Sequence, residues 1–251
     1  MIPFLLQVQK DFDAFKNTPG CYAHNVKTIS GSLGLQSPAH LYHTELADYW
    51  AGNLPEGNEK IALVELNPQY DKDKIAFENT YKTGSWDHYT DFHNNLFLYY
   101  KNKSNGPLSY YQSIASGFSN TTFKNRSHLD FLHENVIRLN IMPYTSVDFN
   151  KTSLCVNAEE YLYNRFRDDL LPFMVRNPTI KKAVFHNKQL TAILIKKKFI
   201  SADHIIYVRM NKGRNHDFIY KKNHKGLDIY IFSRYIPFGG FGKNEVYTNI
   251  F

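Results

Sequence analysis

The sequence has few cysteines and no long hydrophobic run. Its two cysteines, Cys21 and Cys155, give neither zinc-ligand spacing nor a disulfide framework, which fits a reducing cytoplasm. No apolar run approaches the ~18 residues that a transmembrane helix requires. The first six residues lack a basic stretch and soon meet Lys10 and Asp11, so we do not expect a signal peptide. We therefore expect a cytoplasmic protein with no membrane partner.

Metal ligands and cofactor motifs are also missing. The 11 histidines are scattered without ligand spacing, and pairs such as His88 and His93 are more typical of polar surface or loops than of a metal site. We expect neither a metal nor a cofactor.

Length and composition indicate a globular protein. With 251 residues, of which 43% are hydrophobic, the chain is long enough to bury a large core. The sequence contains no internal repeat and no interdomain linker. We expect a single domain over residues 1–251, with a helical extension over about 1–48, and a monomer.

Short apolar runs alternate with helical patterns along most of the chain. Ser37 and Pro38 have the residue types of a helix start, so we expect a helix over 38–50. Residues 212–225 read as a basic loop or a hairpin. The alternation predicts an α/β fold: a three-layer α/β/α sandwich around a mostly parallel four-stranded sheet. The four strands of the sheet are expected near residues 60–67, 136–142, 182–186 and 227–232, and a further strand is expected over 204–209.

Positive charge is concentrated in the last third of the chain. Residues 176–251 contain 15 Lys and Arg against 4 Asp and Glu, a net charge of +11, and many aromatic residues lie among them. Basic and aromatic side chains together suit a nucleic acid, whose phosphates are neutralised and whose bases stack. The alternative is a solvated lysine-rich face over a tyrosine-rich core. The pattern favours DNA as partner.

Polar residues follow the apolar strands. Asn67 comes directly after the first strand, and Pro68 biases it away from helix. The second strand delivers Asn140, the third ends at His186, and the fourth runs into Ser233. In open α/β sheets, ligands bind beyond the carboxyl ends of strands, so these residues are site candidates. An ordinary Asn-Pro turn is the alternative at Asn67.

These motifs resemble the uracil-DNA glycosylase superfamily. The segment Tyr49-Trp50-Ala51-Gly52-Asn53 and the following strand and Asn-Pro turn are similar to a W-x-G-N segment, a strand and an N-P-G-Y turn. The resemblance implies that Asn67 orients the attacking water and that Asn140 reads the edge of an extruded base. The stretch Pro143 to Ser146 is similar to the P-Y-x-S of several bacterial members. The resemblance covers roughly residues 49–245.

Three positions depart from the pattern. Glu65 replaces a glycine, Gln69 stands where a glycine or a pocket-blocking tyrosine is usual, and Ser233-Arg234-Tyr235 replaces the histidine of the last motif. The last departure removes the usual electrophile for the leaving base. Arg234 or His186 is the expected substitute.

Hydrolysis of an N-glycosidic bond suits these residue types. A flipped nucleotide is held in a tight pocket, and an amide at Asn67 positions water without acting as a strong base. Glu65 and Asn67 project to the same strand face, so Glu65 could stabilise the sugar cation or share water activation with Asp71. A lysine partner for Glu65 under the sheet is the equally weighted alternative. Asn140 has both a donor and an acceptor for a pyrimidine edge.

An aromatic residue about a dozen positions past the first motif is expected to stack on the base. We expect Tyr81 in this role, ahead of Phe77 and Trp86. The polar side chain of Gln69 favours a pyrimidine larger than uracil, such as the hydroxymethyl or glucosylated cytosine of some phage DNA, which would imply antiviral defence. The remaining predicted base-binding and DNA-binding residues are Tyr70, Tyr235, Phe238, Lys212 and Arg214.

We therefore expect a monofunctional DNA glycosylase. The alternative is a non-catalytic DNA-binding protein on the same fold, favoured by the missing histidine and by Glu65. An enzyme that acts on free nucleotides is disfavoured by the basic carboxyl-terminal third, because a small substrate needs no extended basic surface.

Overall fold

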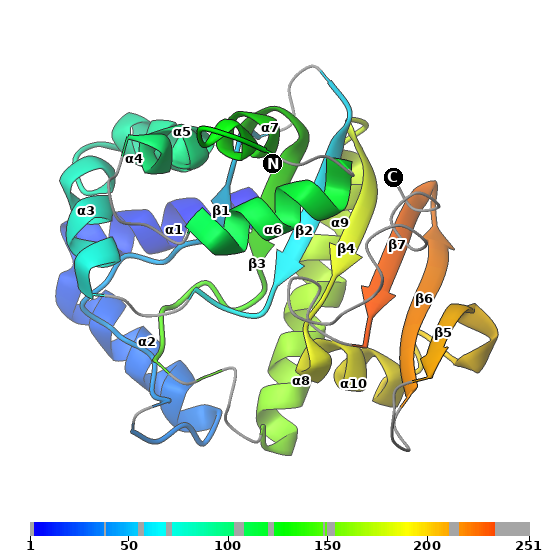
Figure 1. Ribbon diagram of the computed structural model, residues 1–251. Coiled ribbons are helices and arrows are strands. Elements are labelled where there is room, and N and C mark those ends of the chain that lie inside the picture. Colours follow the sequence, from blue (N-terminus) through cyan, green and yellow to red (C-terminus); the bar gives the residue numbers. More distant parts are fainter. Residues whose placement is uncertain are drawn as a thin grey trace. The chain divides into compact units, whose positions relative to one another are not determined.

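The computed structural model describes residues 3–37, 39–54, 58–68, 72–102, 108–119, 123–147, 149, 154–210 and 216–233 (Figure 1). This part of the chain has an α/β fold, as the sequence predicts. The helices are α1 (Pro3–Asn17), α2 (Pro19–Ser32), α3 (Lys72–Lys82), α4 (Trp86–Asn94), α5 (Leu96–Lys101), α6 (Leu108–Ser119), α7 (Ser127–Asn135), α8 (Val156–Asn164), the π-helical turn η2 (Arg165–Leu170), α9 (Leu171–Arg176), α10 (Lys188–Lys196) and the short 3-10 turn η3 (Ala202–His204).

The strands form one mixed sheet of seven strands in the described residues. Their order across the sheet is β1-β3-β2-β4-β7-β6-β5 (Figure 1). β2 pairs with β4 and β4 with β7 in parallel, whereas β6 pairs with both β5 and β7 antiparallel. The strands are β1 (Trp50–Ala51), β2 (Lys60–Glu65), β3 (Val136–Asn140), β4 (Ile180–Phe185), β5 (Ile205–Met210), β6 (His216–His224) and β7 (Leu227–Phe232).

The prediction of a simple four-stranded, mostly parallel sheet is wrong. The four expected strands are present as β2, β3, β4 and β7, but β1, β5 and β6 extend the sheet beyond these four. Of the added strands, β5 matches the strand predicted over 204–209. Residues 216–224, which lie within the segment expected to be a loop or hairpin, form the long strand β6. Its centre is the apolar run Phe218-Ile219-Tyr220. Lys225-Gly226 turn the chain into β7 with positive φ angles of 52° and 86°. The turn favours antiparallel pairing of the two strands that it joins.

The chain divides into two compact units. Unit 1 comprises residues 1–50, 65–93 and 139–176, and unit 2 comprises residues 51–64, 94–138 and 177–251. Each unit draws on three segments of chain, so neither is a contiguous domain. The expected single domain stays a prediction.

The segment 38–50 is not helical in its described residues, contrary to the prediction. Its backbone N–H groups bond outside the segment: Tyr42 donates to the Thr145 carbonyl at 3.0 Å and Asp48 to the Pro143 carbonyl at 2.8 Å. Every residue from 46 to 51 is buried, which a helix with one solvent face would not allow. Tertiary packing therefore overrides the helix-start signal at Ser37.

The sequence predicts an amphipathic helix over residues 158–176 that is interrupted or bent near Pro172. The structure has α8, η2 and α9 in continuous succession instead of a break. Proline has no N–H to donate, and the wider π-helical turn lies immediately before α9, which contains Pro172 near its start. A π-helical turn also shifts the side chains that follow its start around the helix axis.

Candidate functional site

Two asparagines lie at neighbouring strand ends in unit 1. Asn67 is the second residue after β2, and Asn140 is the last residue of β3. The backbone N–H of Met142 donates to the Leu66 carbonyl at 2.8 Å, and the residues just before these two make the equivalent bond at 3.0 Å. The two strand ends therefore lie side by side and run in the same direction.

The sheet order gives the end of β2 a special position. β2 comes before β3, β4 and β7 in the chain, yet β3 lies on one side of it and β4 on the other. In open α/β sheets, ligands bind outside the carboxyl ends of strands at such a reversal of strand order. Asn67 lies just beyond this end of β2.

The Asn67 side chain is buried and only partly hydrogen-bonded. It is 6% exposed, and its Nδ2 donates to the carbonyl of Pro68 at 3.1 Å. Its Oδ1 is buried and accepts no hydrogen bond from the described residues. A buried acceptor without a hydrogen bond costs about 1–3 kcal/mol. We therefore expect a donor from water or from a ligand to bind at this oxygen.

The Asn140 side chain is also buried and has the same free atom. It is 0% exposed, its Nδ2 donates to the Asp48 carbonyl at 2.7 Å, and its backbone N–H donates to the Tyr49 carbonyl at 3.0 Å. Because a carbonyl only accepts, this contact fixes the amide orientation and leaves Oδ1 on the other side. That oxygen has no hydrogen-bond partner among the described residues. Asn140 thus anchors residues 48–49 and keeps one unused acceptor.

A neutral histidine lies close to this anchor. His93 is fully buried, and its Nδ1 lies 2.8 Å from the Trp50 carbonyl and 3.5 Å from the Asp48 carboxylate. Burial lowers the pKa of His93 to about 4, against the opposing attraction of Asp48. The ring is therefore neutral at pH 7, with Nδ1–H as donor. Its Nε2 is a further buried acceptor without a partner in the described chain.

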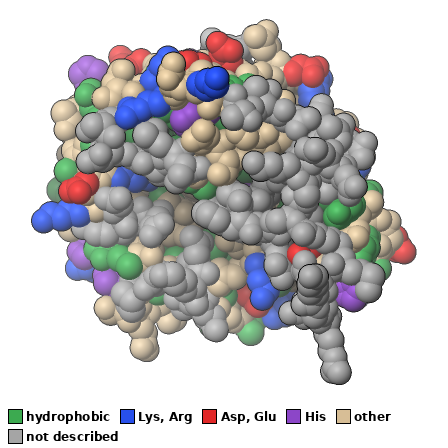
Figure 2. All heavy atoms as spheres, in the orientation of Figure 1, with side chains coloured by type: hydrophobic (Ala, Val, Ile, Leu, Met, Phe, Trp, Pro, Cys, Tyr) green, Lys and Arg blue, Asp and Glu red, His purple; other side chains and the backbone are tan. Residues whose placement is uncertain are grey.

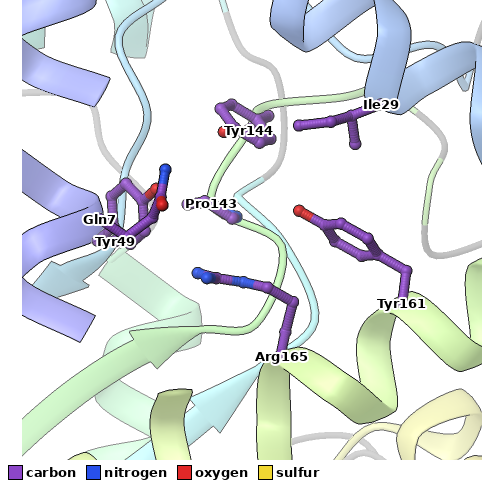
Figure 3. A pocket seen from close by; sticks show the side chains of 7 residues that line it. All are labelled: Gln7, Ile29, Tyr49, Pro143, Tyr144, Tyr161 and Arg165. Atoms are coloured by element: carbon purple, nitrogen blue, oxygen red, sulfur yellow. The ribbon is translucent and has the colours of Figure 1, made fainter. Parts of the chain in front are cut away.

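Unit 1 also contains a cavity of about 290 Å³ (Figure 3). The cavity is lined by Gln7, Ile29, Tyr49, Pro143, Tyr144, Tyr161 and Arg165. Helices α1, α2 and α8, the start of η2, and the two segments that follow Asp48 and Asn140 supply these residues. In Figure 3 the Tyr161 hydroxyl and the Arg165 guanidinium both point into this space.

Asp11 fixes two of the tyrosines that line the cavity. Its Oδ2 accepts from the hydroxyls of Tyr49 and Tyr144, each at 2.7 Å, and its Oδ1 accepts from Gln7 Nε2 at 2.9 Å. Burial raises the pKa of both tyrosines well above the usual value, and the nearby Asp11 charge adds to the shift. Both hydroxyls therefore stay protonated and are committed to the carboxylate.

Arg165 occupies the first position of the π-helical turn. Its side chain is 12% exposed, its Nη1 is paired with the Asp169 carboxylate, and its guanidinium carbon lies 5.8 Å from the centre of the Tyr49 ring. Its Nε and Nη2 are buried and donate to no acceptor among the described residues. A buried cation with two unused donors is uncommon, since buried charges are normally paired and hydrogen-bonded.

Two other predicted residues, Glu65 and Tyr81, also belong to unit 1. Glu65 is half-buried at the end of β2. Tyr81 lies on α3 and is 40% exposed, with its ring centre 6.2 Å from that of Phe92 and 5.2 Å from that of Phe77. Its expected role as the floor of a base pocket stays a prediction.

Two predicted residues lie in unit 2. His186 follows β4, is 2% exposed, and stacks on Tyr110 with ring centres 6.5 Å apart. Ser233 follows β7, and its Oγ accepts from the Phe218 N–H at 2.8 Å, so it closes the end of the β6–β7 pair. Asn187 caps α10 by accepting from the N–H groups of the next helical residues, which fixes the chain after His186.

Several predicted residues lie outside the described part of the chain. They are Gln69, Tyr70, Asp71, Lys212, Arg214, Arg234, Tyr235 and Phe238.

The described basic residues of unit 2 are partly committed to local contacts. Lys221 pairs with Asp228 at 3.0 Å, and Lys222 donates to the Phe199 carbonyl while its ammonium lies 4.5 Å from the Phe199 ring centre. On the face drawn in Figure 2, the Lys and Arg side chains of the described residues occur in small groups with Asp and Glu between them. The described basic residues thus form no continuous patch on that face.

The sequence analysis missed the cavity and its arginine. Tyr161 and Arg165 are four residues apart and therefore share one helix face, a signal that the sequence does contain. Asp11 and Gln7 have the same spacing on α1. The sequence does not predict the π-helical turn. It also does not predict that Tyr49 and Tyr144 donate to the same carboxylate.

Comparisons with protein-family models, with curated proteins and with solved structures give no match. Among the described residues, no three His, Cys, Asp or Glu side chains are grouped so as to hold a metal ion. None of the described helices is long and apolar enough to cross a bilayer.

Proposed function

We propose that this protein is a monofunctional DNA glycosylase that hydrolyses the N-glycosidic bond of a flipped uracil or a 5-substituted pyrimidine. The observation that carries the proposal is the pair of adjacent strand ends at Asn67 and Asn140. Each presents a buried side-chain oxygen without a hydrogen-bond donor in the described residues. The resemblance to the uracil-DNA glycosylase superfamily assigns the same two asparagines to water and to base.

The free oxygens define complementary roles. Oδ1 of Asn67 accepts a hydrogen from water and orients the water oxygen toward C1′ of the deoxyribose. As the glycosidic bond breaks, its electron pair leaves with the base nitrogen, and the water oxygen forms the new bond to C1′. Oδ1 of Asn140 accepts an N–H from the base edge, which selects a base with a donor there. The proton released from water passes to solvent or to a carboxylate such as Glu65.

DNA is the proposed partner because the last 76 residues of the chain carry a net charge of +11. A monomer acting in the cytoplasm, with helices on both faces of the sheet as in a three-layer sandwich, belongs to the same proposal. Hydroxymethyl or glucosylated cytosine of phage DNA remains the proposed larger substrate, with excision as a defence.

A non-catalytic DNA-binding protein is the second candidate. The observation that favours it is burial: Asn67 is 6% exposed and Asn140 is 0% exposed. A base reaches these side chains only if neighbouring groups move. In that case the two asparagines serve the packing of the strand ends, and the basic residues alone contact DNA.

Abasic-site formation separates the two candidates. Wild-type protein is incubated with DNA that contains uracil, hydroxymethylcytosine or glucosylated hydroxymethylcytosine, in single-stranded and duplex form, at DNA concentrations above the Kd of each variant. Alkaline cleavage then counts the abasic sites. We expect sites in at least one substrate with the wild type and a loss of activity with Asn67→Ala and Asn140→Ala.

Asn102→Ala is the matched control, because Asn102 is an exposed asparagine at the end of α5. This variant is expected to retain wild-type activity. DNA binding without abasic sites in any substrate would establish the binding protein instead. Neither binding nor cleavage would reject both candidates.

A further inference from the structure

The cavity around Arg165 has the composition of a ligand site. Its volume of about 290 Å³ is at the lower end of the range for small-molecule pockets, roughly 300–1,000 Å³. Ile29, Pro143, Tyr49 and Tyr144 contribute aliphatic and aromatic surface to the cavity that Arg165 borders (Figure 3). Aromatic rings and polar groups line this cavity together, a combination found in sites that orient a small molecule.

The unused donors of Arg165 form a fork. Nε and Nη2 lie on the same edge of the planar guanidinium, and both lack an acceptor among the described residues. Asp169 takes Nη1 and leaves this edge free. A guanidinium edge with two parallel N–H groups matches the two oxygens of a carboxylate or a phosphate. The missing group is therefore an oxyanion.

Charge near the cavity selects between these anions. The Arg165 cation is already paired with the Asp169 carboxylate, and the Asp11 carboxylate lies behind Tyr49 and Tyr144. A second negative charge on the ligand would meet these carboxylates with no further cation among the lining residues. A singly charged carboxylate is favoured over a phosphate monoester, which carries more than one charge at pH 7.

The walls select the body of the ligand. Because the Tyr49 and Tyr144 hydroxyls are committed to Asp11, these residues offer their rings to the cavity. The Tyr161 hydroxyl points into the same space (Figure 3) and is a further donor for the anion. Flat rings and aliphatic side chains favour a planar, apolar body.

The position of Arg165 in the helix is a separate indication. It begins the π-helical turn η2, and single π-helical turns within α-helices occur frequently at functional sites. The guanidinium already points into the cavity (Figure 3), but its Nε and Nη2 are buried, so binding at this edge requires a small movement of the groups around it.

We infer that this cavity binds a small organic monocarboxylate with a planar, apolar body, held by the Nε and Nη2 edge of Arg165. The inference does not rest on the glycosylase proposal, because none of the lining residues is assigned to water or base in it.

Benzoate is a suitable probe, titrated into the full-length protein and followed by chemical-shift changes in two-dimensional NMR spectra. We expect a Kd on the order of 1 mM or below. Benzamide has the same shape without the charge and is expected not to bind. Phenyl phosphate, the doubly charged comparison, is expected to bind at least tenfold more weakly than benzoate.

Arg165→Lys keeps the charge but removes the fork, and we expect it to weaken benzoate binding at least tenfold. Arg167→Lys is the matched control, because Arg167 lies two residues away, pairs with Asp168 in a similar way and is exposed. It is expected to bind benzoate as the wild type does. Tyr161→Phe keeps the ring and is expected to weaken binding severalfold, which tests the site even if Arg165→Lys fails to fold.

Three results would overturn the inference: no benzoate binding to the wild type, equal binding of benzoate and benzamide, or undiminished binding to both Arg165→Lys and Tyr161→Phe. Asn67→Ala separates this test from the glycosylase test. That variant is expected to bind benzoate normally, whatever its effect on abasic-site formation.

Discussion

Two regions of the molecule differ in the hydrogen-bonding groups that they leave unused. One is the pair of strand ends at Asn67 and Asn140, and the other is the π-helical turn at Arg165. The asparagines leave two buried oxygens without donors, whereas the arginine leaves two buried nitrogens without acceptors, in the part of the chain that the structure describes. Both regions belong to unit 1. The first region is complementary to a ligand that donates, such as water or a base edge, and the second to an anion that accepts.

The difference has a structural origin. Each asparagine lies at a strand end beside a backbone carbonyl, to which its Nδ2 donates, and its Oδ1 is left without a donor among the described residues. A helical arginine reaches across a cavity, and its partner at i+4 consumes only one end of the guanidinium. A buried polar group without a hydrogen bond lowers the stability of the fold, so we expect each region to bind a partner of its own.

The largest expected effect concerns the acceptor at Asn67. Asn67→Ala removes the oxygen that positions water, and we expect activity to fall by about 10²–10³, the usual loss for one positioned polar group. Asn67→Asp keeps an acceptor at the same place and is expected to lose less. Initial rates of abasic-site formation, measured at saturating DNA, give both values. Equal losses in the two variants would show that the amide N–H, and not the oxygen, is what the reaction needs.

We expect low pH to reduce the stability of the fold near Asn140 through protonation of His93. The pKa of this buried ring falls from 6.5 in the unfolded chain to about 4 in the fold, so the unfolded state binds the proton first. The contribution of the neutral ring to stability is complete above pH 6.5 and is lost as the pH falls from 6.5 to 4. Over this range the loss amounts to roughly 3 kcal/mol, from 1.36 kcal/mol per pKa unit.

Urea unfolding of the wild type and of His93→Gln at a series of pH values measures this loss. The variant is expected to lack this component of the pH dependence, while His88→Gln, an exposed histidine on the same helix, is expected to keep it. Identical pH profiles for the wild type and His93→Gln would mean that the ring is already charged in the fold.

The two asparagines are expected to differ in stability even if both are needed for activity. Asn140→Ala leaves the Asp48 carbonyl without its donor, and we expect a loss of about 1–3 kcal/mol in the free energy of unfolding. Among the described residues, the Asn67 amide donates only to the carbonyl of Pro68 beside it, so Asn67→Ala is expected to cost less than about 1 kcal/mol. Chemical denaturation of the two variants measures the difference, and a larger cost at Asn67 would contradict this account.

The sequence predicts the central strands and the residues at their ends better than it predicts the segments between them. Apolar runs bounded by turns mark β2, β3, β4 and β7, because interior strands are apolar on both faces. The strand β6 is missed because the segment 212–225 is rich in Lys and Arg, which is typical of a loop. The segment 38–50 is mistaken for a helix because local cap residues cannot report that its N–H groups bond to residues a hundred positions away.

The same limit applies to the sites. The positions of Asn67 and Asn140 at strand ends are predictable because strand ends are local features, whereas their role in a site stays a prediction. Arg165 is not predictable in this way, since its unused donors depend on a π-helical turn and on Asp11, which lies more than 150 positions earlier and fixes the tyrosines around it. The burial of the two asparagines is likewise invisible in the sequence, which predicts a crevice at their positions.

The smallest expected effect tests whether the donor region is a site or an internal support. Arg165→Met removes the cation and its unused donors but leaves the partly buried Asp169 unpaired, so we expect a net loss of about 1 kcal/mol in the free energy of unfolding. Arg167→Met is expected to leave stability unchanged within error, because that pair is exposed. Benzoate at ten times its Kd is expected to stabilise the wild type by about 1.4 kcal/mol and Arg165→Met not at all. A different outcome would contradict this account: Arg165→Met unfolds the protein, and Arg165→Lys restores both stability and benzoate binding. The positive charge of residue 165 would then be what matters, and the two parallel N–H groups of the guanidinium would not be needed.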